Sequence, residues 1–179
     1  MEFKELTTLR RSCRNFKEGM RIDDALLREL VELANQAPSW KNTQSSRYHI
    51  VSSPELVERI KTETLPEYNQ NTSKNAAAYV VTSFVKNTVG FDKDGNLINE
   101  LGNGWGIYDL GLHNMNFILA AKDRGIDSLI LGLRDVDKIR EILHISEAET
   151  IVSVIALGYQ EEQKSKPVRK SVDELAKVY

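Results

Sequence analysis

Apolar residues recur at helical spacing along much of the chain. Leu27, Leu30 and Ala34 lie on one such stripe, and Asp23 ahead of them can cap the N-terminus of a helix with its carboxylate. Pro38 is expected to end this helix, because the residue before a proline avoids helical backbone angles. The predicted helices cover residues 2–9, 24–37, 54–62, 105–124 and 136–143.

The longest predicted helix, residues 105–124, carries apolar residues on more than one face. A helix with this pattern is buried on several sides, so we expect it to be central. Gly125 is expected to end it, because glycine adopts the left-handed angles of a helix C-terminus without strain.

Short runs of β-branched and apolar residues lie between these helices. Residues 76–85 and 150–158 are almost wholly apolar, which is typical of strands buried on both faces. Because helices and strands are interleaved, the predicted class is α/β or α+β with a central sheet. The predicted strands cover residues 48–51, 76–85, 128–131 and 150–158.

Polar stretches separate the predicted elements. Asp94-Gly95 predicts a turn, and the tail from residue 164 onward is basic and then amphipathic. No linker rich in Pro, Gly or Ser divides the sequence, so residues 1–179 are expected to form one domain. The predicted loops cover residues 39–46, 64–75 and 86–104.

The composition is ordinary for a soluble globular protein, with 41% hydrophobic and 28% charged residues. The formal net charge of -2 provides no overall attraction to nucleic acid or to an anionic membrane. No apolar run is long enough for a membrane helix, and the first residues lack the apolar core of a signal peptide. We therefore expect a cytoplasmic protein.

Metal and disulfide chemistry find little support in the sequence. Cys13 is the only cysteine, which excludes an intramolecular disulfide. Its basic neighbours favour a reactive thiolate, but a buried, inert thiol is the more frequent case. His49, His113 and His144 are scattered singly, so no metal site is predicted.

A dense basic motif follows the first predicted helix: Arg10, Arg11, Ser12, Cys13 and Arg14. Guanidinium forks match phosphate oxygens in a bidentate way, and a serine hydroxyl adds a neutral donor, so the motif has the composition of a phosphate clamp. The alternative is a solvated basic turn, since cations also suit a helix C-terminus.

A second basic cluster, Lys166, Arg169 and Lys170, lies near the other end of the chain. Pro167 stiffens this basic cluster. The alternative is a solvated tail, the commonest fate of terminal charges.

Two polar segments between these clusters offer further ligand groups. Pro38, Ser39, Trp40 and Asn42 belong to a loop whose amide and hydroxyl groups can read the edge of a planar heterocycle. Asn71 and Lys74 precede the apolar strand at 76–85, and Lys74 could hold a negative charge. The alternatives are an ordinary polar loop and a capped turn with an exposed lysine.

Taken in order, these segments resemble the FMN-dependent nitroreductase family over nearly the whole chain. The motifs that carry the resemblance are RRSCRNF at 10–16, APSWKNTQ at 37–44, NQNTSKN at 69–75, AAKDRGIDSLILG after the long helix, and KPVRK near the C-terminus. The resemblance implies an α+β sandwich, with a mixed, mainly antiparallel sheet around a long central helix. It also implies an intertwined homodimer with FMN at the subunit interface.

The resemblance further implies a role for individual residues. Arg10 and Ser12 would bind the FMN phosphate, with Arg11 as an addition or substitute. Arg169 would join them from the tail, with Lys166 or Lys170 as a further cation. Arg14, Lys74 and Asn71 would lie near the flavin pyrimidine edge, where cations oppose the charge of the reduced ring. Pro38, Ser39, Trp40 and Asn42 would come from the partner subunit. Gly132, after Leu131, would place a backbone N–H near flavin N5.

The chain departs from the family pattern at Leu131-Gly132, where many relatives have Glu-Gly. The backbone donor is kept, but any role of the acidic side chain is lost. The segment 86–104 is also shorter than the excursion that surrounds the substrate in larger relatives. Trp105 and Tyr108 are candidates for the apolar walls of a substrate mouth, with core packing as an equal or better alternative.

The implied activity is a ping-pong reaction in which a hydride passes from NAD(P)H through FMN to a nitroaromatic, quinone or similar small acceptor. Three alternatives stay open. They are a dehalogenase-like flavoenzyme on the same fold, a non-catalytic FMN carrier or sensor, and a nucleic-acid module, which the net charge disfavours.

Overall fold

The computed structural model describes residues 1–162 and 165–179. Its centre is a four-stranded sheet in the order β1-β2-β4-β3, in which every neighbouring pair is antiparallel. The apolar strands β2 and β4 lie in the middle, as their sequences predict. The strands are β1 (Ser46–Val51), β2 (Ala78–Val85), β3 (Asp127–Leu131) and β4 (Glu149–Gly158).

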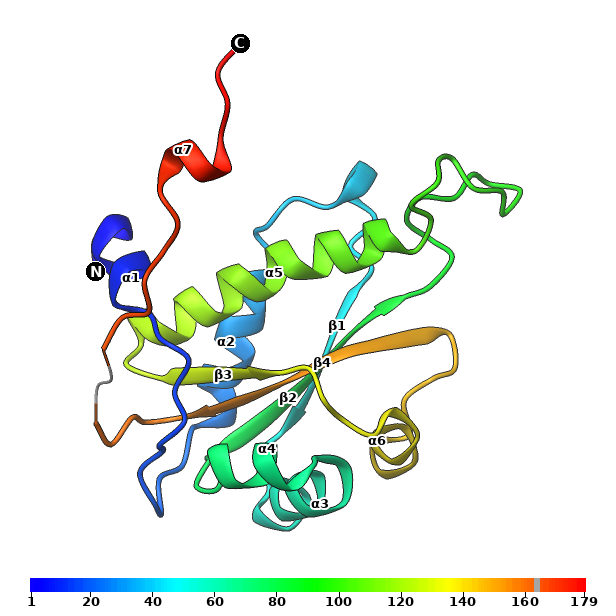
Figure 1. Ribbon diagram of the computed structural model, residues 1–179. Coiled ribbons are helices and arrows are strands. Elements are labelled where there is room, and N and C mark those ends of the chain that lie inside the picture. The colour runs from blue at the N-terminus through cyan, green and yellow to red at the C-terminus, as the bar shows by residue number, and fades with distance from the viewer. Residues whose placement is uncertain (163–164) are drawn as a thin grey trace.

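One face of the sheet is covered by the long helix α5 (Gly104–Asp123), with α2 (Asp24–Ala34) beside it (Figure 1). Leu27 and Leu30 of α2 and Phe117 of α5 pack in one buried cluster with sheet residues. Gly106 lets α5 approach the sheet, because a Cβ at this position would overlap the Phe84 ring. The N-terminal helix α1 (Phe3–Leu9) contacts α5, and the ammonium group of Met1 pairs with Asp123 at the end of α5 (2.8 Å).

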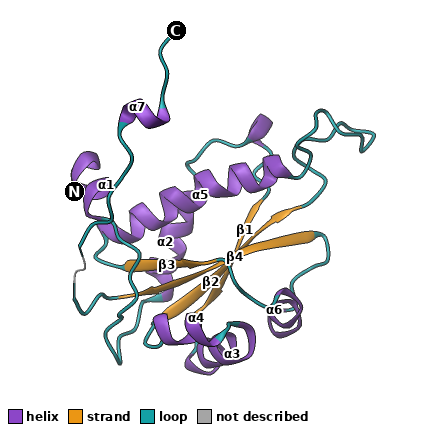
Figure 2. Cartoon of the chain, in the orientation of Figure 1, coloured by secondary structure: helices purple, strands orange, loops and turns teal. Residues whose placement is uncertain are grey.

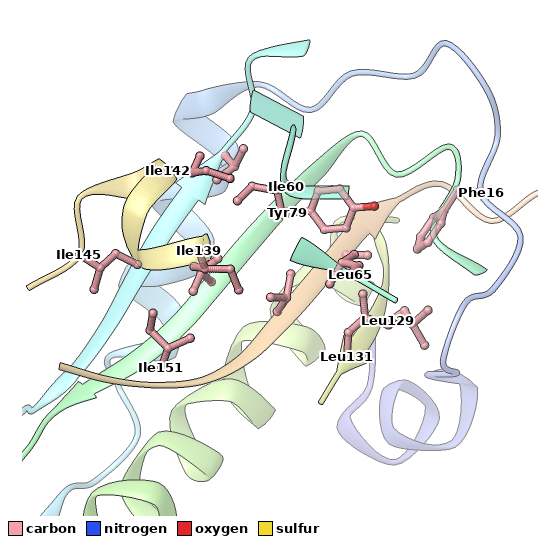
Figure 3. Close-up of a cluster of buried hydrophobic side chains, with 14 of the residues drawn as sticks. Phe16, Ile60, Leu65, Tyr79, Leu129, Leu131, Ile139, Ile142, Ile145 and Ile151 are labelled. Atoms are coloured by element: carbon pink, nitrogen blue, oxygen red, sulfur yellow. The ribbon is translucent and has the colours of Figure 1, made fainter. Parts of the chain in front are cut away.

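The opposite face carries α3 (Pro54–Thr64), α4 (Glu67–Thr72) and α6 (Val136–Leu143) (Figure 2). Figure 3 shows the second buried cluster, in which Ile60, Ile139 and Ile142 approach Tyr79 and Ile151 of the sheet. The sheet is therefore the middle layer between two helical layers. This arrangement confirms the predicted α+β class, with a long central helix and a mainly antiparallel sheet.

Two short helical segments lie outside these layers. η1 (Trp40–Asn42) is a single 3₁₀ turn before β1, and α7 (Val172–Leu175) lies in the C-terminal tail. The tail passes α1 and then extends away from the sheet (Figure 1).

Most predicted elements are confirmed, and two expectations are wrong. Residues 64–75 were expected to be irregular, but Glu67–Thr72 form α4. This helix is polar and is stabilised by tertiary hydrogen bonds, such as Asn69 Nδ2 to the Leu133 carbonyl (2.9 Å), instead of an apolar stripe. The helix α2 ends at Ala34 rather than at Pro38, because the chain already turns at Asn35.

Candidate functional site

The two ends of the chain meet at a pocket of ≈ 440 Å³, called here the arginine pocket. The residues after α1 line one side, and residues of the tail line the other. None of the described residues that line the arginine pocket is acidic. The lining residues are Arg10, Arg11, Ser12, Arg14, Ser165, Pro167 and Arg169.

The electrostatics of the arginine pocket are dominated by like charges. The pKa of Arg10 is lowered, first by burial and then by the nearby guanidinium groups of Arg169 and Arg11. Crowding of cations without a compensating carboxylate is unfavourable unless an anion joins them. The pocket therefore has the donor set and the charge to bind a phosphate.

One backbone hydrogen bond holds the basic turn against β3, and the Arg11 side chain bonds to carbonyls of α1 and of the turn itself. The Cys13 N–H donates to the Ser128 carbonyl of β3 (2.9 Å), and Arg11 Nη1 donates to the carbonyls of Thr8 (2.5 Å) and Arg10 (2.7 Å). Cys13 is buried, and burial raises the pKa of its thiol, so it is held as a neutral thiol. The segment is anchored rather than being a freely solvated turn.

A second pocket of ≈ 280 Å³, called here the β3 pocket, adjoins the arginine pocket, because Arg14 lines both. Gly132 lies on its rim with open backbone, and a Cβ built there would meet no atom within 4 Å. A planar ligand can therefore approach this peptide closely. The residues lining the β3 pocket are Arg14, Tyr68, Asn69, Thr72, Leu129, Ile130, Leu131, Gly132 and Leu133.

Several residues singled out from the sequence lie outside both linings. Asn71 and Lys74 are exposed, and α4 presents Tyr68, Asn69 and Thr72 to the β3 pocket in their place. Sequence reasoning missed these residues because it treated the segment as irregular and had no helical face to assign. Lys166 and Lys170 are likewise exposed in the tail and do not line the arginine pocket.

A third pocket, of ≈ 230 Å³, contains Pro38, Ser39 and Trp40 and is called here the tryptophan pocket. The ring centroids of Trp40 and Trp105 are 4.6 Å apart, and those of Trp105 and Tyr108 are 5.7 Å apart. Tyr108 is 59% exposed, so the core-packing alternative is wrong for its side chain. Asn42 is exposed, has a positive φ of 56° and does not line this pocket.

The segments η1, which contains Trp40, and α1, which leads into Arg10, lie near opposite ends of α5 (Figure 1). Trp40 is hydrogen-bonded to Asp109 near the start of α5, whereas α1, which leads into Arg10, is tied to Asp123 at its end. One chain therefore does not bring the two groups of predicted ligand residues together.

Two further features, a metal-binding cluster and a membrane-spanning helix, are absent from the part of the chain that the structure describes. Residues 1–162 and 165–179 contain no group of three or more His, Cys, Asp or Glu side chains placed to hold a metal ion. Within the same residues, every helix is too short or too polar to cross a membrane.

Known proteins with similar sequences and folds point to one family. The sequence model of the Nitroreductase family matches residues 8–159. The Bacillus subtilis protein MhqN, provisionally named an NAD(P)H nitroreductase, is 26% identical, and the match covers 97% of each chain. A nitroreductase family protein of Streptococcus pneumoniae has a similar structure, with a TM-score of 0.85, 20% identity and coverage of 99% of this chain and 100% of that one. A protein of Exiguobacterium sibiricum, solved in complex with FMN, superimposes with a TM-score of 0.81 at 21% identity, over 100% of this chain and 98% of that one.

Proposed function

This chain belongs to the nitroreductase family, and we propose that it is an FMN-dependent oxidoreductase. In this proposal it takes a hydride from NAD(P)H and delivers it to a nitroaromatic, a quinone or a similar small acceptor. The observation that carries the proposal is the convergence of Arg10 and Arg169, from opposite ends of the chain, on one pocket without an acidic lining residue in the described part of the chain.

The arginine pocket fits the phosphate of FMN. Arg10, Arg11 and Arg169 would neutralise the dianion, and Ser12 would add a hydroxyl donor. Each charge-assisted hydrogen bond would contribute about 1.5–3 kcal/mol to binding. An anion here would also relieve the mutual repulsion that contributes to the lowered pKa of Arg10.

The β3 pocket fits the ring of the same cofactor. Arg14 would supply a positive charge near the ring, and the open backbone at Gly132 would supply a peptide donor. When bound, FMN supplies the capacity to accept and donate a hydride, and the residues of this chain bind and orient it. The FMN complex of the Exiguobacterium sibiricum protein supports this assignment.

The separation of the tryptophan pocket from the arginine pocket supports a homodimer. A second copy of the chain would bring its Pro38, Ser39, Trp40 and Asn42 to the β3 pocket of the first. Ile107 and Met115 of α5 are exposed, at 49% and 40%, and provide apolar surface for such a contact. Trp40, Trp105 and Tyr108 would then form the apolar wall beside the substrate.

The kinetic scheme that we propose is ping-pong. NAD(P)H and the acceptor would occupy the same place in turn, so double-reciprocal plots at several fixed acceptor concentrations should be parallel. The name of MhqN supports NAD(P)H as the co-substrate. Intersecting lines would contradict the scheme.

The experiment that tests the proposed function starts from the purified protein and added FMN. We expect a yellow dimer whose visible absorption bleaches on anaerobic addition of NADH or NADPH and recovers on addition of a quinone or nitroaromatic. A colourless monomer that is indifferent to FMN would overturn the proposal. Retention of FMN with negligible reduction by either nucleotide would support the carrier or sensor alternative, and dehalogenation of a halogenated acceptor would support the dehalogenase-like one.

A further inference from the structure

Two side chains, those of Arg134 and Asn69, hold two successive carbonyl groups of the loop that follows β3. Arg134 Nη1 donates to the Gly132 carbonyl (2.6 Å), and Arg134 Nη2 donates to the Ile151 carbonyl of β4 (2.6 Å). Asn69 Nδ2, from α4, donates to the next carbonyl of the loop, that of Leu133 (2.9 Å). The loop is thus fastened to two different elements of the fold.

These contacts fix the direction of the peptide N–H groups in the loop. Described peptide bonds in the chain are all trans, so each N–H points away from the carbonyl of the same peptide unit. Holding the Gly132 carbonyl therefore orients the Leu133 N–H, and holding the Leu133 carbonyl orients the Arg134 N–H. Gly132 and Leu133 both line the β3 pocket.

The Asn69 side chain is buried and that of Arg134 is half-buried, so the fold holds both donors in place. Asn69 is only 6% exposed, and its carboxamide is committed to the loop. Burial lowers the pKa of Arg134, and its Nε is buried without a hydrogen-bond partner in the described residues. Burying a guanidinium group is costly, and here it fixes the backbone at the rim of a pocket.

We propose that Arg134 and Asn69 are positioning residues that fix the 132–133 and 133–134 peptide groups, and so the direction of the Leu133 and Arg134 N–H groups, beside the flavin ring. This inference rests on the proposed function, because it assigns the β3 pocket to that ring. Neither residue is expected to touch the substrate.

The chain offers a matched control in Arg140. This arginine also donates to backbone carbonyls, those of Ile145 (3.0 Å) and Glu149 (3.0 Å), but it holds the loop between α6 and β4. In the described part of the chain, Arg140 lines neither the arginine pocket nor the β3 pocket nor the tryptophan pocket. Arg140→Met should therefore lower stability in the same way as Arg134→Met without touching the β3 pocket.

The test compares wild type, Arg134→Met, Arg134→Lys and Arg140→Met. In the flavin-free proteins, hydrogen–deuterium exchange of the Asp135 amide, which donates to the Thr64 carbonyl (2.7 Å), should be about tenfold faster in Arg134→Met but not in Arg140→Met. In the FMN-loaded proteins, Arg134→Met should have an altered flavin absorption spectrum and midpoint potential. Its kcat should be roughly 10–100-fold lower, less than the loss expected for outright removal of a preorganised donor. Arg134→Lys should be intermediate, because an ammonium group cannot bridge both carbonyls as a guanidinium fork does.

The outcomes separate this inference from the function on which it rests. Wild-type protein that binds no flavin would overturn the proposed function and this inference with it. Wild-type protein that binds flavin, with Arg134→Met and Arg140→Met indistinguishable in amide exchange, spectrum and potential, would overturn this inference alone. If Arg134→Met does not fold, the same measurements on Arg134→Lys decide whether the inference holds. A wild-type spectrum, midpoint potential and exchange rate in Arg134→Lys would overturn it.

Discussion

The backbone N–H of Trp40 donates a hydrogen bond of 2.9 Å to the carboxylate of Asp109, which is 2% exposed. This contact fixes the loop before β1 to the first turns of the central helix. It also places Trp40 against Trp105, whose ring in turn lies against Tyr108, so a single buried acid organises the tryptophan pocket.

Replacing Asp109 by alanine should release this loop. The Trp40 N–H loses its acceptor, which should lower the free energy of unfolding by about 1–3 kcal/mol. Trp40 and Trp105 are the only two tryptophans of the chain, so intrinsic fluorescence should report the change directly. Asp109→Asn keeps an oxygen acceptor and serves as the control. Equal fluorescence spectra for Asp109→Ala and wild type would contradict this role of Asp109.

Removing one guanidinium group from the arginine pocket should weaken FMN binding more than it weakens the fold. Arg10→Ala and Arg169→Ala should each raise the Kd of FMN by roughly 10–150-fold, the factor that corresponds to one charge-assisted hydrogen bond of 1.5–3 kcal/mol. Fluorescence titration of the flavin-free proteins measures this change, and urea unfolding measures stability.

Lys177→Ala is the matched control for the arginine variants, because Lys177 is an exposed cation in the same tail. It should leave the Kd almost unchanged. The interpretation fails if Lys177→Ala weakens binding as strongly as Arg169→Ala, because the effect would then be one of overall charge. The double variant Arg10→Ala/Arg169→Ala should show non-additive losses, since both groups act on one anion.

How far the sequence alone predicts this molecule depends on where the stabilising contacts lie. The strands β2 and β4 and the helix α5 are predictable because burial on several sides leaves an apolar pattern in the sequence. The helix α4 was missed because a hydrogen bond from Asn69 to the Leu133 carbonyl stabilises it, and such a contact depends on a residue 64 positions away in the sequence.

The candidate site also combines residues that the sequence reveals with residues that it does not. The basic motif at Arg10 and the tail cluster at Arg169 are visible in the sequence, but only the resemblance to a family predicts that they meet. Asn71, which was predicted to lie at the ring edge, is exposed on α4, whereas Asn69 lines the β3 pocket. The sequence did not predict this helix and so gave no helical face. Arg134 left no signal, because its acceptors are backbone carbonyls, which every residue carries.

Adding a methyl group at Gly106 should disrupt the contact between the central helix and the sheet. A Cβ there would overlap the ring of Phe84, which is buried in β2, so α5 or the ring must move. Gly106→Ala should therefore lower the free energy of unfolding by about 1–3 kcal/mol, as overpacking does in other cores. Urea unfolding at one fixed protein concentration measures the difference.

Gly111 provides the control on the same helix, because a Cβ there would meet no atom of the chain within 4 Å. Gly111→Ala should be neutral or should stabilise the flavin-free chain by up to about 1 kcal/mol through helix propensity. A Gly106→Ala protein as stable as Gly111→Ala would show that the approach of α5 to Phe84 is not tight.

Acid should weaken a polar cluster that links three strands of the sheet. The Glu149 carboxylate of β4 accepts hydrogen bonds from His49 Nε2 of β1 (2.8 Å) and from the Ser83 hydroxyl of β2. Burial acts to raise the pKa of Glu149, but these hydrogen bonds and the nearby charges of His49 and Arg47 outweigh it, so the pKa is lowered.

The sign of the pH dependence follows from this lowered pKa. A carboxyl group whose pKa is lower in the folded state contributes stability above its unfolded pKa of about 4.3, and the contribution is lost as the pH falls through the folded value. The difference in unfolding free energy between wild type and Glu149→Gln should therefore be largest above about pH 5 and shrink below about pH 4. Glu100→Gln, at an exposed position, is the control and should match wild type across this range. If the difference in unfolding free energy between wild type and Glu149→Gln stays constant from pH 7 to pH 3, the charge of Glu149 does not stabilise the cluster. Its hydrogen bonds would then be the whole contribution.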